Sequence, residues 1–120
     1  MKIKLQDAEL KVMDVIWSEG TASAKLIYET LKERYGYSRS ATYTLINRCI
    51  DKQAIKRIEP GFLCKAMVTK EEAQAIETKE LIDKLYDGSA DRLVASILGR
   101  SDLSEKDIDR LRKMVREWKD

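Results

Sequence analysis

Apolar residues recur at three- and four-residue steps along the first half of the chain, which predicts three helices. The first spans Gln6 to Ser18 and is closed by Glu19-Gly20. Thr21 is the expected N-cap of the second, which stops at Gly36, and Ser38 caps the third after a short turn. The apolar stripes are Ala8, Leu10, Met13, Ile16 and Trp17; then Ala24, Ile27, Tyr28, Leu31 and Tyr35; then Leu45, Ile46, Cys49 and Ile50.

The pattern changes after the third helix. Two short stretches rich in apolar and β-branched residues, Ile55 to Glu59 and Phe62 to Val68, predict strands. Pro60-Gly61 suits the turn between them, since Pro presets φ and Gly accepts a positive φ. Three helices, two of them in helix-turn-helix spacing, followed by this hairpin predict a winged helix. The expected fold class is therefore mainly α with a small β-hairpin wing.

The second half of the chain predicts further helices. Thr69 and Glu72 form a capping box at the start of a long helix that stops at Gly88. A shorter helix runs from Ser89 to Gly99, and a last one follows a second capping box. That box is made by Ser104 and Asp107.

The apolar stripes of these C-terminal helices are too large for so short a segment to bury by itself, because a small domain has little interior. We expect a dimer to bury them, the alternative being that the helices fold back onto the winged helix. The predicted dimerisation residues are Ile82, Leu85, Tyr86, Leu93, Val94, Ile97, Leu98, Ile108, Leu111, Val115 and Trp118. The predicted domains are residues 1–68, a winged-helix DNA-binding domain, and residues 69–120, a helical dimerisation domain.

Composition argues against catalysis. The chain has no His, so it lacks the usual general base and metal ligand, and its five Gly fall at element boundaries rather than in a phosphate-binding loop. Cys49 and Cys64 have no CxxC spacing, which predicts neither a disulfide framework nor a zinc site. We expect no enzyme, no cofactor and no metal. The short apolar runs and the charged start of the chain predict a cytoplasmic protein.

Charge is unevenly distributed and points to a polyanion. Residues 1–68 carry twelve Lys and Arg against eight Asp and Glu, whereas residues 69–120 carry eleven against thirteen. The excess lies on the outward face of the third helix and on the wing, where short hydrogen-bonding side chains accompany the cations. Such a face suits the major groove of DNA, with cations on phosphates. The candidate DNA-binding residues are Arg39, Ser40, Tyr43, Thr44, Asn47, Arg48, Lys52, Lys56, Arg57 and Lys65.

The segments DAELKVMDVIW, SRSATYTLINRCIDKQAI, YDGSADRLVASIL and LSEKDIDRLRKMV, in this order, resemble the BlaI/MecI/CopY family of bacterial repressors. The resemblance implies a winged helix with a C-terminal helical dimerisation region, in a protein that represses a resistance or metal-handling operon. A two-fold homodimer would present two third helices to a palindromic or near-palindromic operator. The family's third-helix pattern is met by Thr44, Leu45, Arg48 and Lys52, and it is departed from at Ala41, Cys49 and Gln53, the last usually Gly.

The resemblance leaves the inducing signal open. The copper-responsive branch carries a cysteine-rich hook that is absent here. The β-lactam branch is relieved when a membrane sensor protease triggers cleavage, and the corresponding neighbourhood here lies near Ser96-Ile97. Two alternatives to this repressor are a thiol- or metal-responsive regulator of another operon, in which Cys49 or Cys64 would sense a thiol reagent or a ligand, and a winged-helix protein-interaction module that binds no DNA.

Overall fold

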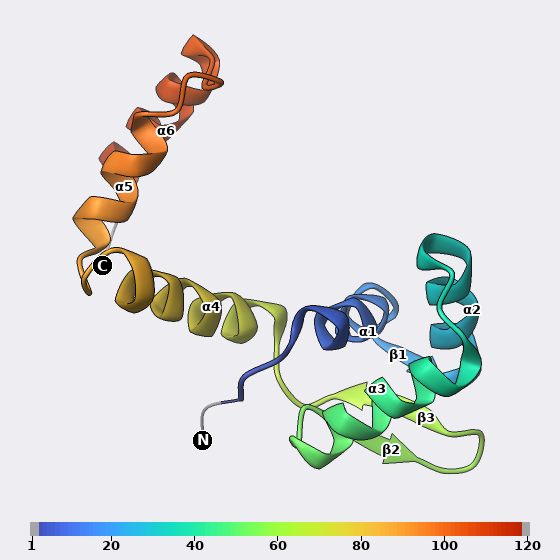
Figure 1. Cartoon of the computed structure of the whole chain (residues 1–120). Coiled ribbons are helices and arrows are strands. Elements are labelled where there is room, and N and C mark those ends of the chain that lie inside the picture. The colour runs from blue at the N-terminus through green and yellow to red at the C-terminus, as the bar shows by residue number, and fades with distance from the viewer. Residues whose placement is uncertain (1–2, 119–120) are drawn as a thin grey trace. The chain divides into compact units, whose positions relative to one another are not determined.

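The computed structural model describes residues 3–118, which form six helices and three short strands (Figure 1). No helix among them is long and apolar enough to span a membrane. The chain divides into two compact units, residues 1–78 and 79–120. The first unit contains the predicted winged helix together with the first part of α4 (Lys70–Leu85). The functional division at residue 68 stays a prediction.

Helix α1 (Asp7–Glu19) carries one face of the core. Val12, Met13, Val15 and Ile16 are buried on it at helical spacing. At its start the carboxylate of Glu9 accepts a hydrogen bond from the backbone N–H of Gln6, which satisfies a donor that has no partner within the helix. Gly20 is the C-cap that follows the last helical residue, as predicted.

The predicted start of the second helix is wrong by two residues. Thr21 is not an N-cap, because Thr21–Ser23 form a strand, β1, that pairs with β3. The N-cap is Ser23, whose hydroxyl accepts from the N–H of Leu26 at 3.0 Å. Helix α2 (Ala24–Tyr35) then ends at Gly36, whose φ of 73° lies in the left-handed region that favours glycine.

Helix α3 (Arg39–Asp51) begins where the sequence predicts. Ser38 caps it by accepting from the N–H of Ala41 at 3.1 Å. It ends in a Schellman motif, in which the N–H of Gln53 bonds to Ile50 and the N–H of Ala54 bonds to Cys49. Gln53 occupies the left-handed position of this motif, with φ 65°.

The wing is confirmed, but it belongs to a three-stranded sheet rather than an isolated hairpin. Strands β2 (Ile55–Ile58) and β3 (Leu63–Ala66) are antiparallel, and β1 adds to the other edge of β3 in the order β1-β3-β2. Gly61 has the expected positive φ, 93°. The sheet faces the helices with Ala22, Ile55 and Cys64, which are buried.

The core of the first unit lies between α1, α2, α3 and the inner face of the sheet. It extends to Val68, just before α4, and the carbonyl of this residue accepts a hydrogen bond from the indole N–H of Trp17 at 3.0 Å. The capping box of α4 is confirmed: Thr69 and Glu72 exchange backbone-to-side-chain hydrogen bonds of 3.0 and 3.1 Å.

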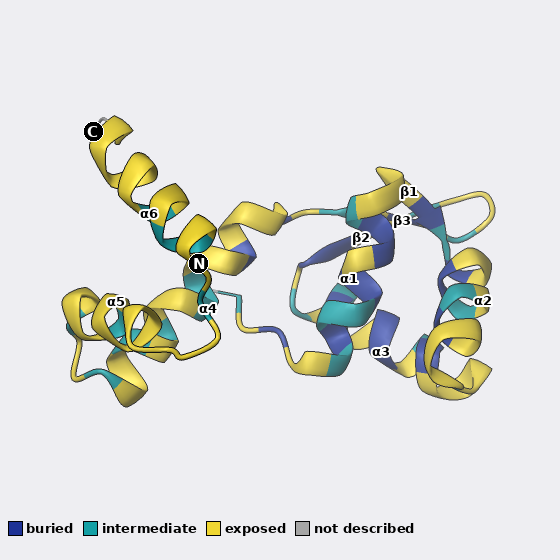
Figure 2. Cartoon of the chain, turned by 90° about the horizontal axis from the view of Figure 1, so that it is seen from above, coloured by how far each residue is buried: buried dark blue, intermediate teal, exposed yellow. Residues whose placement is uncertain are grey.

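Residues 79–118 have no comparable interior. Helices α5 (Ala90–Leu98) and α6 (Glu105–Glu117) contain no buried residue, and Figure 2 draws them in yellow and teal without dark blue. The predicted capping box of Ser104 and Asp107 is present, with both hydrogen bonds at 3.1 Å. This unit is therefore helical without a core of its own.

Candidate nucleic-acid interface

The outward face of α3 carries most of the predicted DNA-binding residues. Arg39, Ser40, Thr44, Asn47 and Arg48 are exposed, whereas the opposite face places Leu45, Ile46 and Cys49 in the core. The first turn of the helix contains no acid. Its unpaired N–H groups and positive dipole end are therefore available to an anion.

Two hydroxyls on this face already have local partners. Thr44 donates to the carbonyl of Ser40 at 2.9 Å, and the Oγ atoms of Ser38 and Ser40 lie 3.3 Å apart. The hydroxyl of Thr44 therefore keeps its lone pairs and its methyl group for an incoming base. Such a group accepts from adenine or cytosine amines and contacts the thymine methyl.

Asn47 and Arg48 project outward one residue apart. Neither side chain makes a hydrogen bond or an ion pair with any other residue in the range 3–118. An amide with two donors and one acceptor can read a base edge, and an unpaired guanidinium can hold a phosphate in a bidentate way. A group suited to reading a base and a group suited to holding a phosphate therefore occupy consecutive positions of α3.

An aromatic pair connects the start of α3 to the wing. The rings of Tyr43 and Phe62 meet edge to face with centroids 5.7 Å apart. Arg39 lies over Tyr43, with Cζ 5.1 Å from the ring centroid, and Arg57 lies over Phe62 at 3.6 Å. The carbonyl of Phe62 also accepts from the N–H of Ala24 at 2.9 Å. We call these four side chains the arginine-aromatic stack; it holds two guanidinium groups at fixed places.

Sequence reasoning missed Phe62, which it treated only as the start of a strand. The sequence held only a weak indication of its role, because a single aromatic residue beside a Pro-Gly turn is common. Glu59 completes the wing tip: it accepts from the N–H of Phe62 and pairs with Arg57. These two contacts, the backbone hydrogen bond first, lower the pKa of Glu59.

Lys56 and Lys65 lie apart from the arginine-aromatic stack. They are directly opposite each other on β2 and β3, so their side chains share one face of the sheet. That face is the outer one, because the neighbouring positions Ala22 and Cys64 point into the core. Two like charges opposite each other are mutually destabilising unless an anion compensates them.

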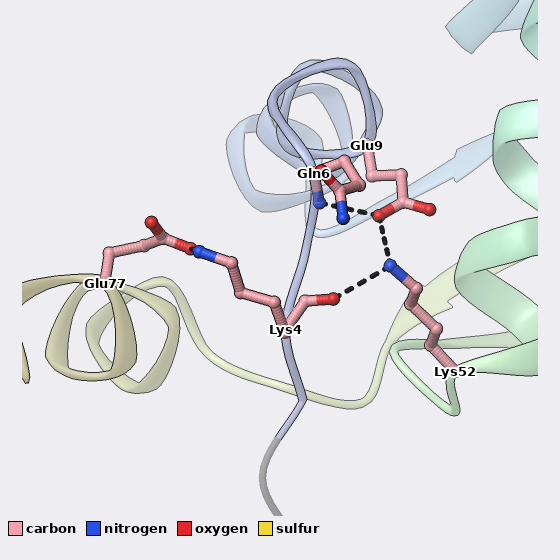
Figure 3. Close-up of polar contacts among 5 residues, drawn as sticks. All are labelled: Lys4, Gln6, Glu9, Lys52 and Glu77. Carbon is pink, nitrogen blue, oxygen red and sulfur yellow. Dashed lines mark hydrogen bonds and ion pairs between the residues drawn. The ribbon is translucent and has the colours of Figure 1, made fainter. Parts of the chain in front are cut away.

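Lys52 is placed differently from the other predicted contacts. Its ammonium lies 2.6 Å from Oε1 of Glu9, which is buried, and it also donates to the carbonyl of Lys4 at 2.8 Å (Figure 3). The structure thus engages Lys52 inside the first unit rather than on the outward face of α3.

The two cysteines lie in the core. Both are free and buried, and burial is the main cause that raises the pKa of Cys49 to about 12 and that of Cys64 to about 11. Thiols in such surroundings react slowly, because the thiolate is the reactive form. Nothing in this geometry favours a thiol sensor.

The second unit holds an open apolar groove of about 1080 Å³ between α5 and α6. Seven predicted dimerisation residues line it: Val94, Ile97, Leu98, Ile108, Leu111, Val115 and Trp118. Met114, which the sequence analysis missed, lines it too, although its position three residues after Leu111 was a usable signal. The other four predicted residues, Ile82, Leu85, Tyr86 and Leu93, are not part of the groove.

Comparison with known proteins agrees with this architecture. The model of the penicillinase repressor family matches residues 5–117. The methicillin resistance regulatory protein MecI of Mammaliicoccus sciuri is 30% identical over 114 residues, 93% of each chain. The penicillinase repressor of Staphylococcus aureus is 26% identical over 118 residues, 97% of this chain and 94% of that one.

The fold has a solved counterpart as well. It is similar to the solution structure of the DNA-binding domain of the repressor BlaI, with a TM-score of 0.55 and 24% identity, over 60% of this chain and 90% of that one. The likeness confirms the winged-helix prediction. Together with the match over residues 5–117, it also confirms the resemblance first seen in the motifs. The chain belongs to the penicillinase repressor family.

Proposed function

We propose that the protein is a transcriptional repressor, not an enzyme, that binds double-stranded DNA as a homodimer. One observation carries the proposal most directly: the outward face of α3 exposes Asn47 and Arg48, which make no hydrogen bond or ion pair within residues 3–118, on a helix whose first turn has no acid. A solvated helix face would more commonly pair its cations with acids. The relatives named above are regulators, which supports the same conclusion.

The proposed contacts divide by chemistry. Ser40, Tyr43, Thr44 and Asn47 face base edges in the major groove, and Arg48 holds a phosphate. Arg39 and Arg57, fixed by the arginine-aromatic stack, grip the backbone beside the groove. Lys56 and Lys65, on the outer face of the sheet, strengthen the general attraction to DNA. Lys52 is not among the contacts, because its ammonium is bound to Glu9.

We infer that the partner in the groove of α5 and α6 is a second copy of the chain. Val94, Leu98, Met114 and Val115 are at least half exposed, which is costly for a monomer in water. A two-fold dimer would cover both grooves and present two α3 helices to two half-sites. The operator is therefore expected to be palindromic.

A resistance operon of the β-lactam type is the proposed target, on the strength of the relatives' names. Release would then follow cleavage prompted by a membrane sensor protease near Ser96-Ile97. That bond lies within α5, and Ile97 lines the groove. Cutting it would separate α6 from the rest of the chain and so destroy the dimer surface.

Fluorescence anisotropy tests the proposal. Purified protein is titrated onto duplex DNA from upstream of its own gene, with a scrambled duplex as the control, over a series of salt concentrations. Tight binding of the first duplex that weakens steeply with salt is expected. If no duplex selected from a random library is bound better than its scrambled counterpart, the protein is a protein-interaction module instead.

Variants of neighbouring residues test the division of roles. Arg48→Ala should weaken binding to every duplex and reduce the slope of log affinity against log salt by about 0.9, the value for one phosphate contact. Asn47→Ala should leave the slope unchanged and reduce the preference for the operator by about tenfold. Equal losses on all sequences for both variants would contradict this assignment.

A further inference from the structure

The Lys52 ammonium connects three separate segments of the first unit, and Figure 3 shows how they meet. It belongs to the residue that ends α3, and it reaches Glu9 in the first turn of α1 at 2.6 Å. Its second partner is the backbone carbonyl of Lys4, at 2.8 Å. The end of α3 is thereby joined to α1 and to the segment that precedes it.

The connection extends in two directions. Oε1 of Glu9 also accepts from the backbone N–H of Gln6 at 2.7 Å, so the carboxylate is fixed at the start of α1. The side chain of Lys4 reaches Glu77 of α4, with 2.9 Å between Nζ and Oε1. These contacts together tie α3 to the N-terminal segment and, through it, to the first part of α4.

The pair itself is unusually placed. The side chain of Glu9 is only 1% exposed, while that of Lys52 is 33% exposed. Burying a carboxylate costs free energy, and well-packed apolar residues are often as stabilising as a buried ion pair. The ion pair instead fixes the relative position of α3 and α1. A hydrogen-bonded charge pair tolerates only one geometry, whereas apolar surfaces can slide against each other.

We propose that Lys52 is a positioning residue: through Glu9 and the Lys4 carbonyl it sets the axial position and rotation of α3, and hence the alignment of Asn47 and Arg48 with DNA. The proposal rests on the function proposed above. Arg48 and Lys52, the C-cap residue, are four residues apart and therefore about one helical turn from each other. Arg48 has no partner among residues 3–118, whereas Lys52 would have to abandon a buried carboxylate to reach a phosphate.

The test uses the full-length protein and the duplex that the wild type selects from a random library, with its scrambled version. The first variant is Lys52→Met, which keeps the apolar stem and removes the charge. The second is Glu9→Gln/Lys52→Met, which removes both charges and so leaves no unpaired buried carboxylate. It serves as the test protein if the single variant unfolds. Lys84→Met, an exposed lysine of α4, is the control for net charge.

A positioning role predicts that the ratio of operator to scrambled affinity falls about tenfold in the Lys52 variants, the scale of one misaligned base contact, with an unchanged salt slope. In ¹⁵N spectra, amides along α3 should shift, including those of residues 44–48. The Lys84 control should match the wild type in both measurements.

Two results would overturn the proposal. A salt slope reduced by about 0.9 with the preference retained would make Lys52 a phosphate contact. An unchanged preference in the folded double variant would leave the pair a purely structural feature. Failure of the proposed function is recognised separately, because then the wild type itself would select no duplex.

Discussion

Gln53 is a residue whose backbone conformation conflicts with its side chain. Its φ is 65°, and it fills the left-handed position of the Schellman motif that ends α3. Residues with a Cβ adopt this region at a cost, which explains why glycine is usual here in the repressors that the motif resembles. The departure noted in the sequence thus has a physical meaning: the chain keeps the turn and bears local strain.

Replacing Gln53 by Gly should relieve this strain. We expect Gln53→Gly to raise the free energy of unfolding by about 0.5–1 kcal/mol, since the relieved strain exceeds the extra entropy that glycine loses on folding. Urea denaturation measures the difference. Gln53→Ala is the matched control and should lie within about 0.5 kcal/mol of the wild type, because its Cβ keeps the strain. A loss of stability in Gln53→Gly would show that the Gln side chain contributes more than the strain costs.

The two buried cysteines should make the free energy of unfolding fall as the pH rises into the alkaline range. In the folded protein the pKa of Cys49 is about 12 and that of Cys64 about 11, above the ordinary value of 9.0. The unfolded chain therefore loses these thiol protons first as pH rises, and stability falls from near the unfolded pKa upward. Each thiol should lower the free energy of unfolding by on the order of 1 kcal/mol between about pH 8 and about pH 10.

Other groups titrate in the same range, so variants isolate the thiols. Cys49→Ala/Cys64→Ala should show a flatter decline of unfolding free energy with pH than the wild type. Val12→Ala truncates the same core without touching a thiol and should keep the wild-type decline. If the cysteine-free protein declines as steeply as the wild type, the thiols are accessible to solvent in the folded state.

At the scale of elements, the wing depends on the arginine-aromatic stack for its orientation. Phe62 contacts Tyr43 of α3 at one edge and Arg57 on its face, and its carbonyl is bonded to the start of α2. A two-stranded hairpin is marginal alone, so these contacts, together with pairing to β1, hold it in place.

We therefore expect Phe62→Ala to weaken binding to all duplexes by about tenfold, because Arg57 loses the ring beneath it and Tyr43, which lies under Arg39, loses its edge-to-face partner. Leu63→Ala is the control: Leu63 is the next residue, is 37% exposed and lies on the outer face of the sheet. Anisotropy titrations compare the two. Equal losses in both variants would mean that general loosening of the wing, not the stack, governs affinity.

Elements encoded by local chemistry could be predicted from the sequence, and those that depend on distant partners could not. The caps at Ser38, Thr69 and Ser104 were predicted correctly, because a side-chain oxygen satisfies an N–H a few residues away. Strand β1 was missed, since three residues carry no periodicity and pair with β3 some forty residues later.

In the candidate site, too, features set by local sequence could be predicted, and features set by distant residues could not. The outward face of α3 follows from helical spacing alone, and every residue assigned to it except Tyr43 and Lys52 is exposed. The partner of Lys52 could not be inferred, because Glu9 lies 43 residues earlier and its buried position depends on how α1 and α3 pack. The edge-to-face contact of Tyr43 and Phe62 likewise depends on the tertiary fold.

At the scale of the whole molecule, affinity for DNA should depend on the groove of α5 and α6. Residues 79–118 have no buried residue, so this part of the chain lacks the apolar interior that usually stabilises a domain. If a second copy covers the groove, folding of this region and dimer formation are linked. The dimer then binds the operator through two α3 helices at once, so its affinity for DNA exceeds that of a single chain.

Val115→Glu tests this linkage, because Val115 lines the groove and is 76% exposed in the single chain. Placing a carboxylate in an apolar interface should raise the dimer dissociation constant on the order of 100-fold, which sedimentation velocity would show as a shift to monomer. At a fixed protein concentration, operator binding should weaken with it, while the weak binding of a single half-site is kept. Lys113→Gln alters the net charge by the same amount on an exposed position of α6 outside the groove and should leave both measurements unchanged. If Val115→Glu remained dimeric, the contact between copies would have to lie on another surface, and the exposed groove would need a different partner.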